Sequence, residues 1–286
     1  MRMSVHPVSI LHPSAPMTPL VIDSPHSGRD YPPDFDYGCP LLSLRQTEDF
    51  LVDELIDGAT KAGATVILAR FPRSYIDVNR AENDIDPDLL AEPWPSPLAP
   101  SPHTRQGLGL VRRLGLSGVP VYAAPLDPAQ IMRRIEVCYR PYHAALQAAI
   151  DERCRLFGAS FLIDMHSMPD GKNHMGGRRA DFVLGDRNGE SCVAHLTHVV
   201  GDSLQDMGYS VALNDPYSGV EIARRYGQPQ HNRNALQLEI NRRLYMDETR
   251  LEKHEGFARV RRDLTRLFES LSSALMEDRD NQLAAE

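Results

Sequence analysis

Short apolar segments alternate along the chain with longer segments of helical periodicity. Six segments are almost continuously apolar and end in polar or glycine-rich turns: Leu20–Asp23, Thr65–Ala69, Phe161–Asp164, Asp181–Leu184, Tyr209–Leu213 and Leu236–Ile240. Such segments are typical of strands buried on both faces of a sheet. Helical patterns between them cover Glu48–Ala62, Asp127–Phe157 and Val193–Met207. The alternation predicts an α/β fold whose mixed, mostly parallel central sheet has helices on both faces.

The helical patterns also carry signals for their ends. Asp127 and Pro128 suit the cap and first position of a helix, and Pro141 predicts a kink or a split further along. A last helix is predicted over Glu252–Met276, where apolar residues recur every three or four positions. Its apolar stripe either packs on the domain or joins two copies of the chain in a homo-oligomer.

Residues 82–118 interrupt this alternation. The stretch AEPWPSPLAPSP at 91–102 has too many prolines for a helix or a central strand, and four glycines follow it by residue 118. Loops of this length in a compact domain are usually functional. We therefore predict a single domain over residues 1–286, with a lid-like Pro/Gly-rich excursion at 82–118.

Charge and composition narrow the class of partner. The 286-residue chain has a net charge of -8, which argues against a nucleic-acid or anionic-membrane surface because such surfaces concentrate Lys and Arg. No stretch approaches the roughly 18 apolar residues of a membrane span, and no signal peptide is recognised at the start. The four cysteines form no C-x-x-C pair, as expected of reduced thiols in the cytoplasm. A small acidic partner would need a local cluster of arginines.

Two strand ends carry the same local pattern. In VIDSPHSG and FLIDMHSM an apolar run meets an Asp and then a His, so His26 and His166 are expected at the same edge of the sheet. Neutral imidazoles in such a place are natural zinc ligands. Asp23 and Asp164 stand where a carboxylate could orient each ring. A structural, hydrogen-bonded histidine is the alternative at either position.

A catalytic zinc site has three protein ligands and an open position, so a third ligand is needed. The start of the predicted helix at 48–62 offers Glu48, Asp49 and Asp53. Acids at a helix N-terminus are also favourable without any function, so both interpretations stay open.

Arginines and one strand acid complete the candidate chemistry. Arg73 and Arg80 follow a predicted inner strand, and Arg224 precedes another. Their planar guanidinium groups suit bidentate binding of carboxylates. Glu239 interrupts an apolar strand, and a buried carboxylate needs a partner or a task. It could act as a general base beside a metal, or pair with Arg242 or Arg243.

Six segments in order, SPHSG, IDVNR, DMHS, DFVLGDRNGESC, ARRYG-x-P and QLEINRRLYMDE, resemble the N-formylglutamate amidohydrolase (deformylase) family over about Val21 to Glu248. The resemblance implies a three-layer α/β/α fold related to zinc carboxypeptidases and aspartoacylases. It also implies metal-dependent hydrolysis of N-formyl-L-glutamate to glutamate and formate, as in histidine degradation. The cofactor implied is one divalent metal ion, zinc being expected.

The same resemblance implies a role for particular residues. His26, Asp49 and His166 would hold the metal, with Glu48 as the alternative carboxylate, and Glu239 would be the general base. The residues that would hold substrate carboxylates are Asn79, Arg80, Arg112 and Arg224. Two other functions stay open: a deacylase of another N-acyl amino acid, such as an N-acetyl or N-succinyl compound, and a non-enzymatic, metal-clamped binder of acidic amino acids.

Overall fold

A seven-stranded sheet organises the computed structural model, which describes residues 6–115 and 118–285. Its strands are β1 (Val8–Leu11), β2 (Leu20–Ser24), β3 (Thr65–Ala69), β4 (Ser160–Met168), β5 (Phe182–Gly185), β6 (Val211–Leu213) and β7 (Arg233–Asn241). They lie in the order β1-β3-β2-β4-β7-β5-β6. The pairs β2–β4, β4–β7 and β5–β6 are parallel and β5–β7 is antiparallel. The predicted mixed, mostly parallel sheet is confirmed.

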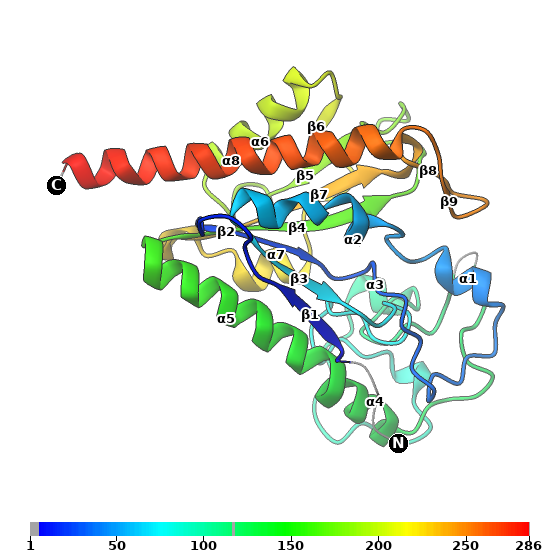
Figure 1. The fold of residues 1–286 in the computed structure, drawn as a ribbon. Helices are drawn as coiled ribbons and strands as arrows, with labels where there is room; N and C mark the ends of the chain where they lie inside the picture. The colour runs from blue at the N-terminus through cyan, green and yellow to red at the C-terminus, as the bar shows by residue number, and fades with distance from the viewer. Residues whose placement is uncertain (1–5, 116–117, 286) are drawn as a thin grey trace. The chain divides into compact units, whose positions relative to one another are not determined.

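Eight α-helices are found in the described residues. They are α1 (Leu41–Arg45), α2 (Val52–Leu55), α3 (Pro102–Arg105), α4 (Pro128–Arg134), α5 (Arg140–Phe157), α6 (Ala194–Asp206), α7 (Glu221–Tyr226) and α8 (Phe257–Ala285). Short 3-10 turns cover η1 (Asp57–Ala62), η2 (Pro87–Leu89), η5 (Pro229–His231) and η6 (Arg242–Leu244), and β8 (Met246–Asp247) pairs with β9 (Glu252–Lys253). Figure 1 shows α2, α6 and α8 on one face of the sheet and α7 on the other. The three-layer prediction is confirmed.

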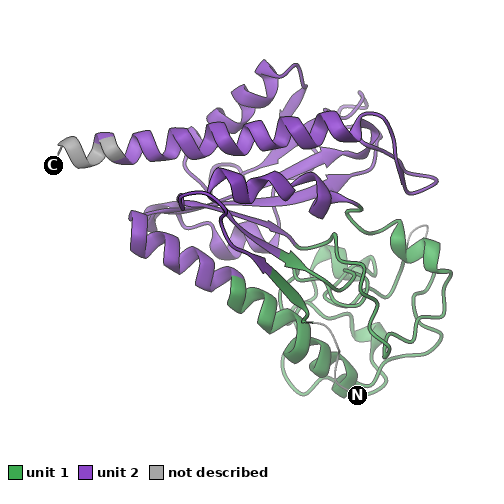
Figure 2. Cartoon of the chain, viewed as in Figure 1, with its two compact units in different colours: residues 1–9, 25–50, 68–145 green, residues 10–24, 51–67, 146–286 purple. Residues whose placement is uncertain are grey.

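Internal contacts divide the chain into two compact units (Figure 2). Unit 1 comprises residues 1–9, 25–50 and 68–145, and unit 2 comprises residues 10–24, 51–67 and 146–286. The prediction of a single domain stays a prediction. Within unit 1, the described residues of the excursion at 82–118 add no strand to the large sheet, and the carbonyl of Leu110 accepts a hydrogen bond from the amide of Asp77 at 2.7 Å.

The apolar stripe of α8 is buried within unit 2. Val260, Leu264 and Phe268 are at most 2% exposed, and the helix contacts α2, α6 and η1. This burial removes apolar surface from water and stabilises the unit. The packing interpretation of the stripe is confirmed. Among the described residues, no helix has the combination of length and hydropathy that crossing a membrane requires.

One predicted helix is wrong. Residues 48–62 form a turn, the single helical turn of α2 and the 3-10 turn η1. Leu51 adopts a left-handed conformation with φ 67°, which a helix interior does not tolerate. Glu48 and Asp49 therefore lie in a turn before α2, where they cannot act as first-turn residues of a long helix.

The pattern over Asp127–Phe157 is split, as Pro141 predicts. Asp127 caps α4 in a capping box with Pro128 at the first position. A π-helical turn, Ile135–Tyr139, then joins α4 to α5, and because Pro141 lacks an N–H it cannot complete the regular helical ladder there. Strand β1 was not predicted, because its apolar run is short and lies between two prolines, Pro7 and Pro13.

Candidate metal centre

His26 lies two residues beyond the end of β2. Its imidazole is 1% exposed, with Nε2 2.6 Å from Oδ1 of Asp77 and Nδ1 3.4 Å from Oδ2 of Asp49. Burial, followed by the positive charge of Arg73, lowers the pKa of His26. The ring is therefore neutral near pH 7, which is the form that coordinates metal ions.

Gly28 explains how this segment approaches the end of β3. A Cβ at position 28 would lie 2.4 Å from the carbonyl oxygen of Phe71 and 2.7 Å from that of Ala69. Only glycine allows the two backbone segments to come so close. The glycine of the SPHSG segment therefore helps to place His26.

Asp49 is the acid of the turn before α2 that faces His26. Its amide donates a hydrogen bond to the carbonyl of His26 at 3.0 Å. Glu48 is instead engaged by Tyr31, whose hydroxyl donates to Oε1 at 2.5 Å, and burial raises the pKa of Glu48 to about 7. Of the two neighbouring acids, Asp49 is the one beside the imidazole.

Asp77 is a residue of the candidate site that the sequence analysis did not single out. Arg73 donates to its Oδ2 from Nη2 at 2.8 Å and from Nε at 3.2 Å. Burial alone would raise the pKa of Asp77, but Arg73, His26 and Arg80 outweigh it and hold that pKa well below its usual range. The expectation that Asp23 orients an imidazole stays a prediction, and Asp77 is the carboxylate that contacts Nε2 of His26. The Asp of the IDVNR segment was the available signal.

Three guanidinium groups gather near this carboxylate in unit 1. Arg112 Nη2 lies 3.7 Å from Asp77 Oδ2, and burial, with the like charge of Arg73, lowers the pKa of Arg112 to about 9. Arg80 donates to the backbone carbonyls of Leu108 and Asn79. Because guanidinium groups donate paired hydrogen bonds to anions, the cluster of Arg73, Arg80 and Arg112 suits an anionic ligand.

In unit 2, two rungs of the sheet carry polar side chains on one face, a rung being a pair of directly opposite residues on neighbouring strands. The register of β4 and β7 pairs Asp164 with Gln237 and His166 with Glu239, and side chains directly opposite each other in a sheet point to the same face. Asp164 Oδ1 lies 2.9 Å from Nε2 of His166, as predicted. His166 lies within β4, beyond the residues paired with β2, and its register partner on β7 is Glu239.

Glu239 is 7% exposed, and its Oε1 accepts a hydrogen bond from Nε2 of Gln237 at 2.9 Å. The carboxylates that bind Arg243 are Asp170 and Asp181, at 2.9 and 2.6 Å. The alternative pairing of Glu239 with Arg243 is therefore wrong, and that with Arg242 stays a prediction.

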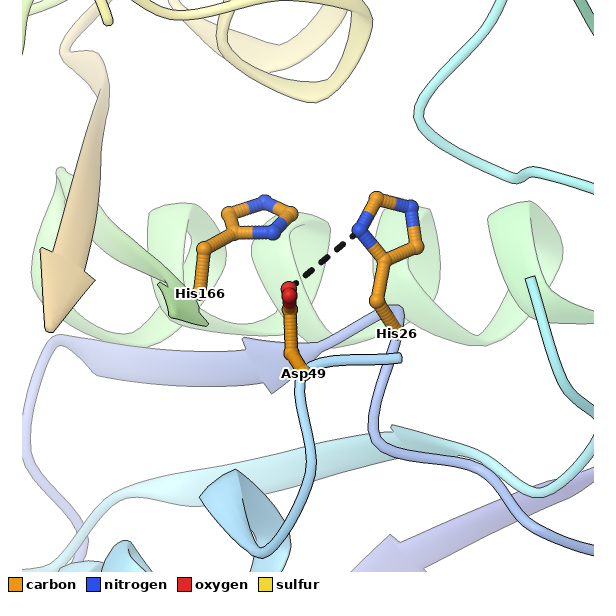
Figure 3. Close-up of side chains that lie close together, drawn as sticks. All are labelled: His26, Asp49 and His166. Carbon is orange, nitrogen blue, oxygen red and sulfur yellow. Dashed lines mark ion pairs between the residues drawn. The ribbon is translucent and has the colours of Figure 1, made fainter. Parts of the chain in front are cut away.

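His26, Asp49 and His166 converge (Figure 3), and one potential ligand atom from each lies within 4.8 Å of the others. In a tetrahedral zinc site with bonds of about 2.0–2.1 Å, neighbouring ligand atoms are about 3.4 Å apart. The 3.4 Å between His26 Nδ1 and Asp49 Oδ2 matches this spacing. Nε2 of each imidazole also lies within 2.9 Å of a carboxylate oxygen, an arrangement that is common for metal-bound histidines. The residues present therefore fit a divalent metal ion.

Arg224 has a different environment from the three clustered arginines. Its Nε and Nη2 each donate to the carboxylate of Glu221 at 2.8 Å, one turn earlier in α7, and its side chain is 56% exposed. A substrate carboxylate would have to compete with Glu221 for this guanidinium group. Its role in substrate binding stays a prediction.

Comparisons with known proteins agree with the resemblance seen in the sequence. The family model for N-formylglutamate amidohydrolase matches residues 18–246. An N-formylglutamate deformylase of Pseudomonas putida is 33% identical over 81% of this chain and 83% of its own length. One from Pseudomonas aeruginosa is 32% identical over 80% and 83%. A crystal structure of an N-formylglutamate amidohydrolase from Ralstonia eutropha is similar with a TM-score of 0.92 and 42% identity, covering 96% of this chain and all of that one.

Proposed function

Because the chain belongs to the N-formylglutamate amidohydrolase family, we propose that it hydrolyses the formyl amide of N-formyl-L-glutamate, with a divalent metal ion, to glutamate and formate. The observation that carries this proposal is the convergence of His26, Asp49 and His166, whose ligand atoms lie within 4.8 Å of one another. Two imidazoles and one carboxylate leave a position open for water, as in catalytic zinc sites. Zinc is the ion we propose.

A divalent ion held by these residues would supply Lewis acidity for the activation of water and of the amide carbonyl. Glu239 accepts a proton from the attacking water and then delivers it to the nitrogen of the leaving amine. The rung that it shares with His166 supports this role. Arg73, 4.0 Å from Asp49, is placed to stabilise negative charge that develops on the carbonyl oxygen.

The substrate is an anion, and the remaining arginines supply its binding energy. We assign the binding of its carboxylates to Arg80 and Arg112 with Asn79, and to Arg224 once Glu221 releases it. Arg80 and Arg112 are each at most 8% exposed, so their charge is poorly screened by water. A buried guanidinium group is stabilised when a substrate carboxylate binds it.

The test combines metal analysis of the purified protein with a formate-release assay. We expect about one zinc per chain and release of formate from N-formyl-L-glutamate. Turnover should disappear after chelation and return when zinc is added. Full activity in a metal-stripped sample would refute the metal-dependent scheme.

A substrate panel separates this function from its nearest alternative. N-formyl-, N-acetyl- and N-succinyl-glutamate differ only in the acyl group, and N-formyl-L-glutamine lacks the side-chain charge. We expect the formyl compound to have the highest kcat/KM and the glutamine analogue to lose most of its binding. Preference for an acetyl or succinyl group would instead assign the chain to another deacylase activity.

A further inference from the structure

Gln237 is a polar side chain of β7 to which the proposed reaction gives no task. It lies two residues before Glu239, so both side chains point to the same face of the sheet. It is 2% exposed, and its Nε2 donates the 2.9 Å hydrogen bond to Oε1 of Glu239.

The opposite end of this amide argues against a purely structural role. Oε1 of Gln237 is buried and has no hydrogen-bond partner within the described part of the chain. Burying an amide whose acceptor is unsatisfied is unfavourable, and an apolar residue of equal length would avoid that cost. The feature that an apolar residue cannot replace is the N–H that reaches Glu239.

The packing beside Gln237 restricts the movement of its side chain. On the β5 side its register partner is Gly185. A Cβ on Gly185 would lie 2.7 Å from the backbone nitrogen of Gly219 and 2.8 Å from the carbonyl carbon of Ser218. The 218–219 backbone therefore covers the sheet at this rung, while Asp164 occupies the other side of the rung.

We propose that Gln237 is a positioning residue that holds the carboxylate of Glu239 in one orientation, with Oε1 engaged and Oε2 performing the proton transfer. This inference rests on the proposed function. A general base must lie within hydrogen-bond distance of the proton that it removes, and a rotated carboxylate would lose that geometry. Gln237 acts through Glu239 and contacts neither substrate nor metal in this scheme.

The test is Gln237→Met in the zinc-loaded enzyme, because Met keeps the length of the side chain and removes the donor. Since small misplacements of a catalytic group can cost about 100-fold in rate, we expect kcat to fall by about 10- to 100-fold. KM, zinc content and melting temperature should stay close to wild type. Asn234→Leu is the matched control: Asn234 is also a buried amide of β7, hydrogen-bonded to Val193 and Ser160. It should lower the melting temperature and leave kcat unchanged.

A double-mutant cycle tests whether the effect passes through Glu239. Once Glu239→Ala has removed the carboxylate, adding Gln237→Met should cost no further rate. Wild-type kcat in Gln237→Met, or the same additional loss in the Glu239→Ala background, would overturn the positioning role. A zinc-loaded wild-type protein that releases no formate would overturn the proposed function itself, which separates the two failures.

Discussion

Asp77 is a buried carboxylate that contacts an imidazole through one oxygen and a guanidinium group through the other. Its Oδ1 lies 2.6 Å from His26 and its Oδ2 2.8 Å from Arg73. The same group therefore orients a proposed metal ligand and balances the charge of Arg73, to which we assign a role in the proposed reaction. A change at this residue should affect metal binding and stability together.

We expect Asp77→Asn to weaken zinc binding by about 10- to 100-fold, the range seen when a carboxylate behind a metal-bound histidine is lost. It should also destabilise the fold by about 3 kcal/mol, because Arg73 loses its buried counter-charge. Competition with a chelator of known affinity measures the first effect and denaturant unfolding the second. Asp86→Asn, which removes another Asp–Arg contact of unit 1 at 2.7 Å, should leave zinc affinity unchanged. Wild-type zinc affinity in Asp77→Asn would contradict the role of Asp77.

Glu239→Gln separates metal binding from proton transfer. Since the amide cannot accept the proton of water, we expect kcat to fall by about 100- to 10,000-fold, with zinc content and KM nearly unchanged. Stopped assays with high enzyme concentration measure the residual rate. Unimpaired turnover would remove Glu239 from its role as general base.

Local sequence could predict only part of this site. His26, His166 and Glu239 stand out because each follows or interrupts an apolar strand. Asp77 does not, since it contacts His26 across 51 residues of sequence, and nothing near His26 indicates that contact. Asp23 was the nearer acid in sequence but not the one that reaches Nε2.

At the level of elements, residues at the end of β7 and in η6 hold the loop that follows β4. Arg243, in η6, pairs with Asp170 and Asp181 at the two ends of residues 169–181. Asn241 donates to Asp170 and to the carbonyl of Ala180. These contacts close the base of a loop that begins three residues after His166.

We expect Arg243→Ala to release this loop, to increase proteolytic cleavage within 169–181, and to reduce the free energy of unfolding by about 1 to 2 kcal/mol. Arg178→Ala, which removes a more exposed contact to Asp170, is the control and should have little effect. Limited proteolysis with mass spectrometry locates the cut. Equal resistance of both variants to proteolysis would contradict the role of Arg243 in holding this loop.

The same variant should change the acid dependence of stability. Burial alone would raise the pKa of Asp181, but hydrogen bonds from Ser210 and Arg243 lower it. A lowered pKa in the folded state contributes stability above the unfolded value of about 3.9, and that contribution is lost as the pH falls through the folded value. Unfolding of Arg243→Ala should therefore depend less steeply on pH below about 5. Parallel curves for the two proteins would exclude this contribution.

Sequence predicted the elements best where periodicity ran without interruption. All six predicted strands are present, because continuous apolar runs leave few alternatives to a buried sheet. The helix predicted over 48–62 failed since Leu51 adopts a positive φ, which no hydrophobic pattern reports. The acids of that stretch were recognised, although their helical setting was not.

Across the whole molecule, the proposed ligands come from positions 26, 49 and 166, so metal binding should be coupled to folding. At about 1,000-fold excess over its Kd, zinc should add about 4 kcal/mol to the stability, or about 10 °C in melting temperature. His166→Ala should abolish the shift. His143→Ala, a buried histidine whose Nε2 lies 3.0 Å from the carbonyl oxygen of Val78, should retain it. An undiminished shift in His166→Ala would exclude this residue as a ligand.

The shared rungs of β4 and β7 also limit which insertions and deletions the gene can tolerate. Side chains alternate along a strand, so a one-residue slip of β7 against β4 would turn Glu239 to the opposite face. Leu238 or Ile240 would then lie beside His166 in place of Glu239, and an aliphatic side chain cannot accept a proton. Length variation among functional variants should therefore be confined to the connecting loops, with none inside 160–168 or 233–241.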